Sequence, residues 1–253
     1  MIAKFSLLCY NRIKYIEKVG YKLLRNEIKY LLKYEDYVML SRRISAMLTM
    51  DKHTKSPDGY RITSLYLDDL NDTSYYEKLS GDTNRKKYRL RAYNYDPSFI
   101  SLECKAKKLN KIEKTSIRID KPTFDMVNSG DFSSLASKDN ELAKRVFALN
   151  RDKGLSPVVA VDYVREAYLH PLSNTRITFD KELSCGITTN DFFSDKYKHA
   201  FVFDKNEVIL EVKFDEYLPE FIRQLLSIGY TPMAASKYML CRDYLKRNSI
   251  VLK

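Results

Sequence analysis

The sequence predicts an α+β protein, namely a closed, eight-stranded antiparallel β-barrel with helices packed outside it. Three observations support this prediction. About eight segments alternate charged and apolar residues with a period of two, which is typical of a β-strand. Segments with helical spacing lie between and after these strands. The charged side of the strands repeats Arg and Lys with single carboxylates, and a closed barrel turns one side of every strand inward.

Strand-like alternation recurs along the chain, and each strand collects its charged residues on one face. The strands are predicted at residues 25–32, 60–69, 85–93, 102–108, 114–119, 161–168, 175–180 and 208–214. In the third of these strands Arg89 and Arg91 lie on the same face, and in the fourth Lys105 and Lys107 do so. Such like charges repel along a strand unless an anion lies between them.

Helical spacing fills the intervals between the strands. Helices are predicted at residues 36–48, 121–130, 139–154, 216–229 and 236–247. Asp36 and Asp139 are the expected N-caps of the first and third helices, because a short carboxylate can accept the free backbone N–H groups there. Residues 49–59 and 184–200 are rich in Lys, Asp, Ser, Thr and Gly and are predicted to be exposed loops.

Composition limits the classes of protein and of partner. The chain has 253 residues, of which 44% are hydrophobic, so it can bury a substantial core, and we expect one domain. Its 44 Lys and Arg residues against 33 Asp and Glu residues give a formal net charge of +11. This charge favours polyanionic partners, which include nucleic acid, anionic membranes, nucleotides and phosphate chains.

Cysteine, histidine and glycine usage restricts the chemistry. Four scattered cysteines without a Cys-X-X-Cys pair predict neither a disulfide framework nor a zinc site. The three histidines lack metal-ligand spacing, so Asp or Glu oxygens would hold any metal, which favours Mg²⁺ or Mn²⁺. No glycine-rich phosphate loop motif occurs, so side chains must hold any phosphate. The sequence contains no apolar run long enough for a transmembrane segment, and we expect a soluble, cytoplasmic protein.

The charged strand faces have two explanations. A half-buried antiparallel sheet with its charges in solvent explains any single strand. Taken together, the repeated Arg and Lys with single carboxylates favour an inward-facing, electropositive lumen that attracts phosphate. Arg grips phosphate oxygens bidentately, Lys acts as a mobile point charge, and a lone carboxylate can hold a divalent ion.

Nine fragments in order resemble the VTC domain, the polyphosphate polymerase branch of the triphosphate tunnel metalloenzymes. The fragments are RNEIKY, YRITSLYLDD, RKKYRLRAY, SLECKAKK with EKTSI, YVREAY, RITFD, LEVKF and SKY. The resemblance implies one tunnel domain over residues 1–253, with a core from about residue 23 to 245. It also implies that ATP is bound with Mn²⁺ or Mg²⁺, and that the γ-phosphate of ATP is passed to a growing inorganic polyphosphate chain. The expected enzyme is therefore a phosphotransferase.

The resemblance also implies roles for individual residues through matching motifs. The expected catalytic groups are Arg89, Arg91, Arg165, Arg176 and Glu211. The expected phosphate- or nucleotide-binding groups are Lys29, Lys105, Lys114, Ser236 and Lys237. Glu211 is the expected metal ligand. Asp68 and Asp180 stand at predicted strand ends, where they would pair with Arg or cap a turn, and they are left outside the site.

Two departures from the wider superfamily bear on the reaction. Hydrolytic relatives begin with Glu-X-Glu-X-Lys, whereas this chain has Arg25 at the first position, which favours chain handling over hydrolysis. Fungal members tend to carry a further Lys just before the Ser-Lys pair, where this chain has Ala234 and Ala235.

Alternative functions remain open at this point. A tri- or polyphosphate hydrolase using the same tunnel and a non-catalytic polyphosphate-binding module both fit the sequence. The basic residues at strand spacing, without an RNP-like motif or zinc finger, argue against a specific nucleic-acid partner. A membrane-protein partner is compatible with a chain that has no transmembrane segment of its own.

Overall fold

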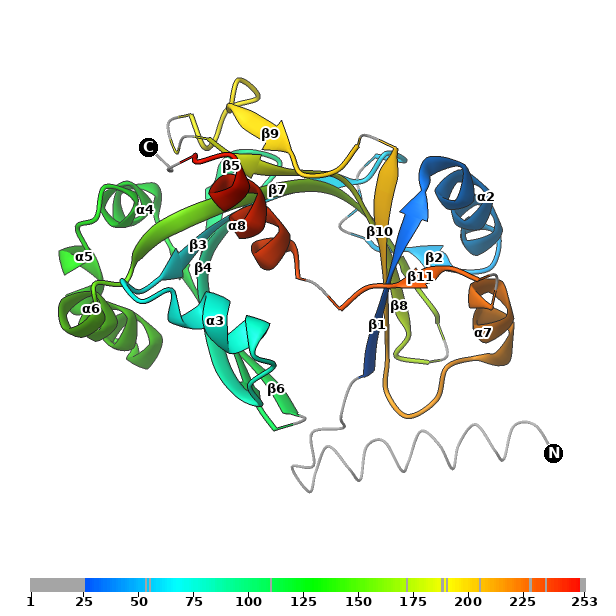
Figure 1. Cartoon of the computed structure of the whole chain (residues 1–253), viewed down its shortest axis with the longest axis horizontal. Coiled ribbons are helices and arrows are strands. Elements are labelled where there is room, and N and C mark those ends of the chain that lie inside the picture. The colour runs from blue at the N-terminus through cyan, green and yellow to red at the C-terminus, as the bar shows by residue number, and fades with distance from the viewer. Residues whose placement is uncertain are drawn as a thin grey trace.

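The computed structural model describes residues 26–250 except positions 53, 55, 110, 172, 188, 190, 205, 228 and 235. Within this part of the chain, one strongly curved sheet forms an arch whose two ends turn toward each other (Figure 1). Helices lie against the outer side of the arch at both ends, and one helix, α8 (Lys237–Arg247), lies on its inner side. Arg25 and Ala235, which the sequence comparison singled out, lie outside the described residues.

All eight predicted strands are present, and their bounds differ from the prediction mainly at the ends. They are β1 (Asn26–Lys33), β3 (Tyr60–Asp68), β4 (Asn84–Tyr93), β5 (Asp96–Lys108), β6 (Lys111–Ile119), β7 (Ser156–Leu169), β8 (Arg176–Gly186) and β10 (Glu207–Phe214). Three short strands were not predicted: β2 (Thr49–Met50), β9 (His199–Phe201) and β11 (Thr231–Pro232). The first two of these fall in segments that were expected to be loops.

The predicted closed barrel is wrong, because the sheet is open. Its strands follow the order β11-β1-β10-β8-β7-β3-β4-β5-β6, with β2 paired to β7 and β9 paired to β8. Among the described residues no backbone ladder joins β6 to the β1–β11 end. Side chains span the gap instead, since Lys105 Nζ on β5 lies 3.7 Å from Glu27 Oε2 on β1. The expected inward-facing surface therefore exists as the concave face of an arch.

The five predicted helices are present, with shifted ends, and two short ones were not predicted. The helices are α2 (Tyr34–Ser45), α3 (Thr73–Leu79), α4 (Lys121–Asn128), α5 (Ser133–Ala136), α6 (Glu141–Lys153), α7 (Glu220–Leu226) and α8. Asn140, not Asp139, caps α6, because its side chain accepts hydrogen bonds from two backbone N–H groups of the first turn. Asp36 lies within the first turn of α2 and does not cap it.

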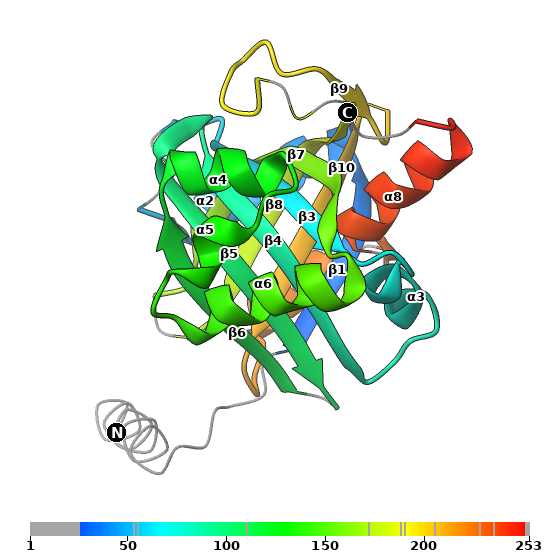
Figure 2. The same cartoon turned by 90° about the vertical axis from the view of Figure 1, so that its left-hand side faces the viewer.

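Apolar side chains cover the convex face of the sheet in two clusters. One packs β4 and β5 against α4, α5 and α6, and it includes Leu90, Leu102 and Phe124 (Figure 2). The other packs β8 and β10 against α2 and α7, and it includes Phe179 and Leu210. Because side chains alternate along a strand, the charged residues between these apolar ones must lie on the concave face.

A third apolar cluster lies beneath α8 on the concave side. It joins Ile62 and Val161 of the sheet to Tyr238, Met239 and Cys241 of α8. The concave face thus has an apolar part that α8 covers and a charged part beside it.

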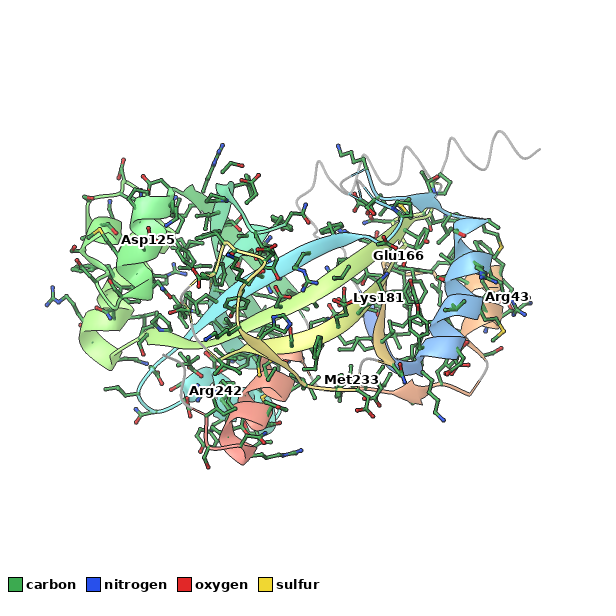
Figure 3. The ribbon with its side chains drawn as sticks, turned by 90° about the horizontal axis from the view of Figure 1, so that it is seen from above. Arg43, Asp125, Glu166, Lys181, Met233 and Arg242 are labelled. Carbon is green, nitrogen blue, oxygen red and sulfur yellow. The ribbon has the colours of Figure 1, made fainter. Side chains whose placement is uncertain are left out.

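A buried carboxylate on the convex face, that of Glu166, joins the sheet to α2. Glu166 on β7 is 3% exposed and accepts a hydrogen bond of 2.6 Å from Tyr37 of α2, and a further one from Tyr168. Lys181 Nζ lies 3.4 Å from the same carboxylate, and Figure 3 shows these two side chains beside each other. A buried charge with three partners is satisfied, so this cluster fixes α2 to the sheet.

Gly59 permits a close backbone approach where β3 begins. Its φ of +101° is a conformation that L side chains rarely adopt, and a Cβ atom there would lie 2.3 Å from the carbonyl oxygen of Arg165. The next residue, Tyr60, pairs directly with Arg165 in the β3–β7 ladder. The glycine therefore helps to set the position of Arg165 on β7.

Replacing this glycine tests the close approach. We expect Gly59→Ala to lower the free energy of unfolding by more than about 1 kcal/mol beyond the loss caused by Gly130→Ala. Gly130 is a matched control, because its φ of +92° is similar but no atom lies within 4 Å of the added Cβ. Urea unfolding of the two variants measures the difference, and equal losses would show that the approach to Arg165 imposes no constraint.

Candidate functional site

The concave face collects the ten residues that the sequence assigned to the site. Those on strands are Lys29 on β1, Arg89 and Arg91 on β4, Lys105 on β5, Lys114 on β6, Arg165 on β7, Arg176 on β8 and Glu211 on β10. Ser236 and Lys237 stand at the start of α8. Two carboxylate-centred groups organise five of them, which are Arg89, Lys114, Arg165, Glu211 and Lys237.

The first group, here called the Glu211 cluster, comprises Arg165, Asp180, Glu211, Lys213 and Lys237. Arg165 grips Asp180 with two hydrogen bonds, of 2.6 Å from Nε and 2.7 Å from Nη2. Lys237 Nζ lies 2.5 Å from the same carboxylate and 4.0 Å from Glu211. Lys213 forms an ion pair with Glu211, and Arg165 Nη2 lies 3.7 Å from it. Three cations thus surround two carboxylates.

Local structure explains how these residues meet. Arg165 and Asp180 face each other directly in the β7–β8 ladder, and Glu211 lies on β10, the next strand. Lys237 is the first residue of α8, and its ammonium lies 4.9 Å from the centre of the Tyr163 ring. The side chain of Ser236 accepts a hydrogen bond from the backbone N–H of Met239 and so caps the helix. This cap fixes the direction in which α8 presents Lys237.

Charge balance in the Glu211 cluster keeps its carboxylates ionised. Burial alone would raise the pKa of Glu211, but Lys237, Lys213 and Arg165 hold it well below its usual range. The pKa of Asp180 is likewise lowered, because Arg165 and Lys237 outweigh the effect of burial. In return, the two carboxylates raise the pKa of Lys237 against the opposing effect of burial.

Glu27 links the Glu211 cluster to the far end of the sheet. Its carboxylate lies 2.7 Å from Lys29 Nζ on β1 and 3.7 Å from both Lys213 on β10 and Lys105 on β5. Burial and the neighbouring Glu211 act to raise the pKa of Glu27, yet the three lysines lower it. One carboxylate thus binds three lysines that belong to both ends of the arch.

The second group, the Glu103 cluster, lies on β4, β5 and β6. Arg89 donates from Nε and Nη2 to one oxygen of Glu103, at 2.8 and 2.6 Å, and from Nη1 to the hydroxyl of Tyr66 at 2.9 Å. Lys114 Nζ lies 2.7 Å from the other Glu103 oxygen. Burial would raise the pKa of Glu103, but Arg89, Arg91 and Lys114 lower it to about 2.

Two predicted arginines lie apart from both clusters. Arg91 is 8% exposed and donates to the hydroxyls of Ser64, at 3.0 Å, and Tyr163, at 3.4 Å. Arg176 forms an ion pair with Asp51 at 2.8 Å. Both occupy the concave face, but no ion pair among the described residues joins them to Glu211 or Glu103.

Five charged residues that the sequence analysis did not assign to the site belong to it. Glu27 and Glu103 hold the lysines and the arginine described above, and Asp180 and Lys213 are parts of the Glu211 cluster. Lys87 on β4 donates to Ser236 Oγ at 3.2 Å, and its ammonium lies 4.5 Å from the centre of the Tyr238 ring. Burial and the surrounding lysines and arginine lower the pKa of Lys87 to about 7. The alternation of charge along β4 and β10 was the available signal for Lys87 and Lys213.

The carboxylates of the described residues suit only a metal ion whose remaining ligands come from phosphate and water. Among the described residues, no three His, Cys, Asp or Glu side chains gather as a metal-binding group. Glu211 is an ionised carboxylate on a cationic surface, and Mg²⁺ commonly uses one or two carboxylates together with substrate phosphates and water. Glu211 could therefore supply one carboxylate ligand to a divalent metal ion that takes its other ligands from phosphate and water.

Comparison with solved structures gives weak similarities, which carry no argument about function. The PH1819 protein of Pyrococcus horikoshii OT3 has a TM-score of 0.46 at 13% identity, over 88% of this chain and 99% of that chain. A candidate adenylate cyclase of Bacillus halodurans has a TM-score of 0.49 at 13% identity, over 83% and 92%. A chain of the Schizosaccharomyces pombe Mediator head module has a TM-score of 0.45 at 8% identity, over 82% and 96%.

Sequence comparison gives a family. No curated protein matches this chain. In the part of the chain that the structure describes, no helix is long and apolar enough to cross a membrane. The family model of the VTC domain matches residues 24–246, a span that contains the Glu211 cluster, the Glu103 cluster and α8 up to its penultimate residue. The chain therefore belongs to the VTC domain family.

Proposed function

We propose that this protein is an ATP-dependent inorganic polyphosphate polymerase, which transfers the γ-phosphate of ATP to the end of a polyphosphate chain. The observation that carries the proposal is the ionisation of the concave face. Each of its four clustered carboxylates, Glu27, Glu103, Asp180 and Glu211, is ion-paired and has a lowered pKa. Seven cations pair with these four carboxylates, so the surface keeps an excess of positive charge that suits phosphate groups and an acceptor that is already ionised. Membership of the VTC domain family supports the same class of substrate.

When phosphate binds, its oxygens would replace or join the carboxylates as partners of the cations on the concave face. The cations on the concave face are held in place by carboxylates, so little ordering is needed when phosphate oxygens replace or join them. In the Glu211 cluster, Arg165 and Lys237 would contact the triphosphate, while Asp180 keeps both side chains directed inward. Arg89 and Lys114, held by Glu103, would contact phosphates at the other side of the arch.

The transfer step needs positioning and charge stabilisation. An oxygen of the terminal phosphate of the chain forms a bond to the γ-phosphorus, the bond from that phosphorus to the β–γ bridging oxygen breaks, and ADP leaves with the electron pair. Arg165 and Arg89 would stabilise the charge that spreads over the transferred group. The attacking oxygen is already ionised, so no general base is required. Mn²⁺ or Mg²⁺ bound at Glu211 would neutralise phosphate charge.

Hydrolysis in the same site is the competing reaction. It requires a water molecule and a group that accepts its proton. A carboxylate whose pKa is held far below neutrality by cations is a weak base, and this describes both Glu103 and Glu211. The low basicity of both carboxylates favours a polyphosphate acceptor over water. We place the reaction in the cytoplasm, with or without a membrane-protein partner, because that is where ATP is supplied.

Neutralising the central carboxylate tests the site. We expect Glu211→Gln to reduce polyphosphate synthesis from ATP and Mn²⁺ by about 10³-fold or more, because it removes the proposed metal ligand and unbalances three cations. Glu220→Gln is the matched control, since Glu220 forms an exposed ion pair with Arg223 on the outer helix α7. The measurement follows long-chain polyphosphate, ADP and free phosphate in one reaction.

The products distinguish the candidate functions. Polymer with ADP supports the polymerase, and free phosphate without polymer would identify a hydrolase instead. If the wild-type protein leaves ATP unchanged, both enzymatic candidates are refuted, and the non-catalytic polyphosphate-binding module remains. Full activity of Glu211→Gln would refute the assignment of the site.

The lowered pKa of Lys87 predicts a pH dependence of phosphate binding. A lysine whose pKa is about 7 is charged below that pH and neutral above it. We expect the affinity for inorganic tripolyphosphate to fall between about pH 6 and about pH 8 more steeply in the wild type than in Lys87→Arg, because Arg keeps its charge. Isothermal titration calorimetry at several pH values gives the two slopes, and protonation of the ligand cancels in their comparison. Equal slopes would show that Lys87 does not change its charge at the phosphate site between these pH values.

A further inference from the structure

A groove outside the concave face is lined by basic residues that the proposed reaction does not use. It has a volume of about 750 Å³ and lies where the start of β4 and the end of β5 meet α3 and α6. The basic residues that line it are Arg85, Lys86, Lys107, Lys108, Arg145 and Lys153. We call this surface the outer groove.

The acidic residues of the outer groove are largely occupied by α3. Asp68 accepts hydrogen bonds from the backbone N–H groups of Ser74, at 2.9 Å, and Tyr75, at 3.1 Å. Asp69 accepts one of 3.0 Å from the backbone of Thr73. These two carboxylates satisfy free N–H groups at the start of the helix, and a third, Glu77, also lines the groove. The six cations of the lining therefore outnumber its three carboxylates.

The cations of the outer groove lack the carboxylate partners that those of the concave face have. Within the described part of the chain, none of the six lies within 4 Å of an Asp or Glu oxygen in an ion pair. Arg85 and Lys107 stand directly opposite each other in the β4–β5 ladder. Like charges in that position repel, and a bound anion removes the repulsion.

The lining suits an anion without bases or apolar groups. Tyr88 is the aromatic residue among those that line the groove, and it is 5% exposed, so it offers no surface on which a nucleic-acid base could stack. Leu155 is 4% exposed, and Leu149 is the one partly exposed leucine among the lining residues, so the groove offers little apolar surface to anchor a peptide side chain. Four of the six cations are lysines, which bind phosphate as point charges.

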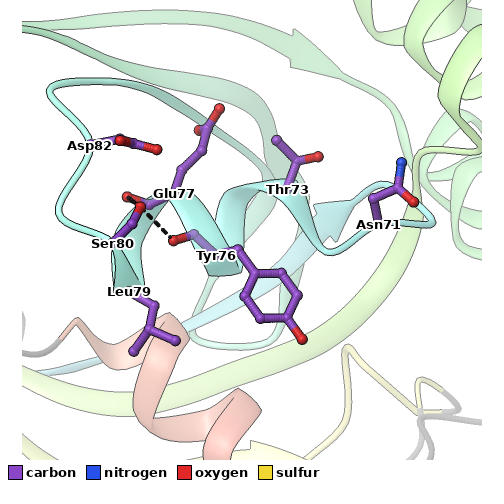
Figure 4. Close-up of a pocket in the computed structure, with 7 residues that line it drawn as sticks. All are labelled: Asn71, Thr73, Tyr76, Glu77, Leu79, Ser80 and Asp82. Carbon is purple, nitrogen blue, oxygen red and sulfur yellow. Dashed lines mark hydrogen bonds between the residues drawn. The ribbon is translucent and has the colours of Figure 1, made fainter.

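A neighbouring hollow lacks these properties. It lies beside α3 and is lined by seven residues, among them Glu77 and Asp82, and no Lys or Arg is among these described residues (Figure 4). Of the two surfaces, only the outer groove has the charge to hold a polyanion.

The outer groove continues onto the concave face. Strand alternation places Arg85 on the same face of β4 as Lys87 and Arg89, whereas Lys86 lies on the opposite face. On β5, Lys107 belongs with Lys105 of the concave face, and Lys108 lies on the other side. Since residues of both faces line the groove, it passes around the ends of β4 and β5.

From this continuity we propose that the outer groove binds the part of an inorganic polyphosphate chain that extends beyond the concave face. The inference rests on the proposed function, because it supposes that a phosphate chain occupies the concave face. It adds a second polyanion site with a different task, which is to hold a chain that is too long for the catalytic surface.

Removal of the lysines from the outer groove tests the proposal by direct binding. The variant Lys86→Gln/Lys108→Gln/Lys153→Gln is compared with Lys52→Gln/Lys196→Gln/Lys198→Gln, which removes three exposed lysines elsewhere. Affinities for tripolyphosphate and for long-chain polyphosphate are measured over a range of salt concentrations. We expect the groove variant alone to lose long-chain affinity at least tenfold, and its slope of log affinity against log salt to fall by about two. Tripolyphosphate affinity should not change.

Each other outcome would overturn the proposal. Unchanged long-chain affinity, or an equal loss in the control variant, shows that the groove is not a specific site. A larger loss for single-stranded DNA than for polyphosphate identifies a nucleic-acid surface instead. If the triple variant has a lower urea midpoint than the wild type, the three single variants replace it in the same comparison.

The test separates this inference from the proposed function. A wild-type protein that makes no polymer, but whose groove variant loses long-chain binding, would contradict the polymerase and retain the groove. If the groove variant makes polymer normally and its long-chain affinity is unchanged, the polymerase proposal stands and the groove proposal is contradicted.

Discussion

The sharing of Asp180 and Glu211 among Arg165, Lys213 and Lys237 is the constraint on which the rest of the site depends. Asp180 is buried, and a buried carboxylate is tolerated only when cations and hydrogen bonds satisfy it. Its partners come from β7 and from the first residue of α8, so one cluster fixes both the strand register and the position of the helix. The inward direction of the cations follows from this pairing. A triphosphate would therefore meet groups that are already oriented.

Ion pairs on the concave face also connect the two ends of the curved sheet. The convex face is covered by helices over two apolar clusters, whereas the concave face carries charges that must find partners across the arch. Glu27 supplies one such partner by binding lysines from β1, β10 and β5. At the open edge, side-chain ion pairs thus connect the two ends of the sheet, as backbone hydrogen bonds would in a closed barrel. Such pairs can rearrange around a ligand, which a continuous ladder could not do without breaking hydrogen bonds.

Cations in this protein occupy two different electrostatic environments. On the concave face, most of them pair with carboxylates within the fold, which keeps their side chains pre-arranged. In the outer groove, no ion pair among the described residues joins the lysines and arginines to a carboxylate. Under the proposed function, this difference would separate a surface that positions phosphate groups for transfer from a surface that retains a chain through net charge alone.

Local alternation was sufficient to predict the strands and their charged face, because side-chain direction along a strand depends only on backbone geometry. Lys29, Arg89 and Glu211 could be predicted in this way together with the family resemblance. Asp180 could not, because β8 continues to Gly186 through an irregularity at Glu182, whose φ is +56°, and the pattern seemed to end at Asp180. Whether the sheet closes into a barrel could not be predicted from the sequence either. Whether the last strands join by a ladder or by side chains depends on the summed twist and curvature of all the strands, and this is decided only when the helices and ion pairs are in place.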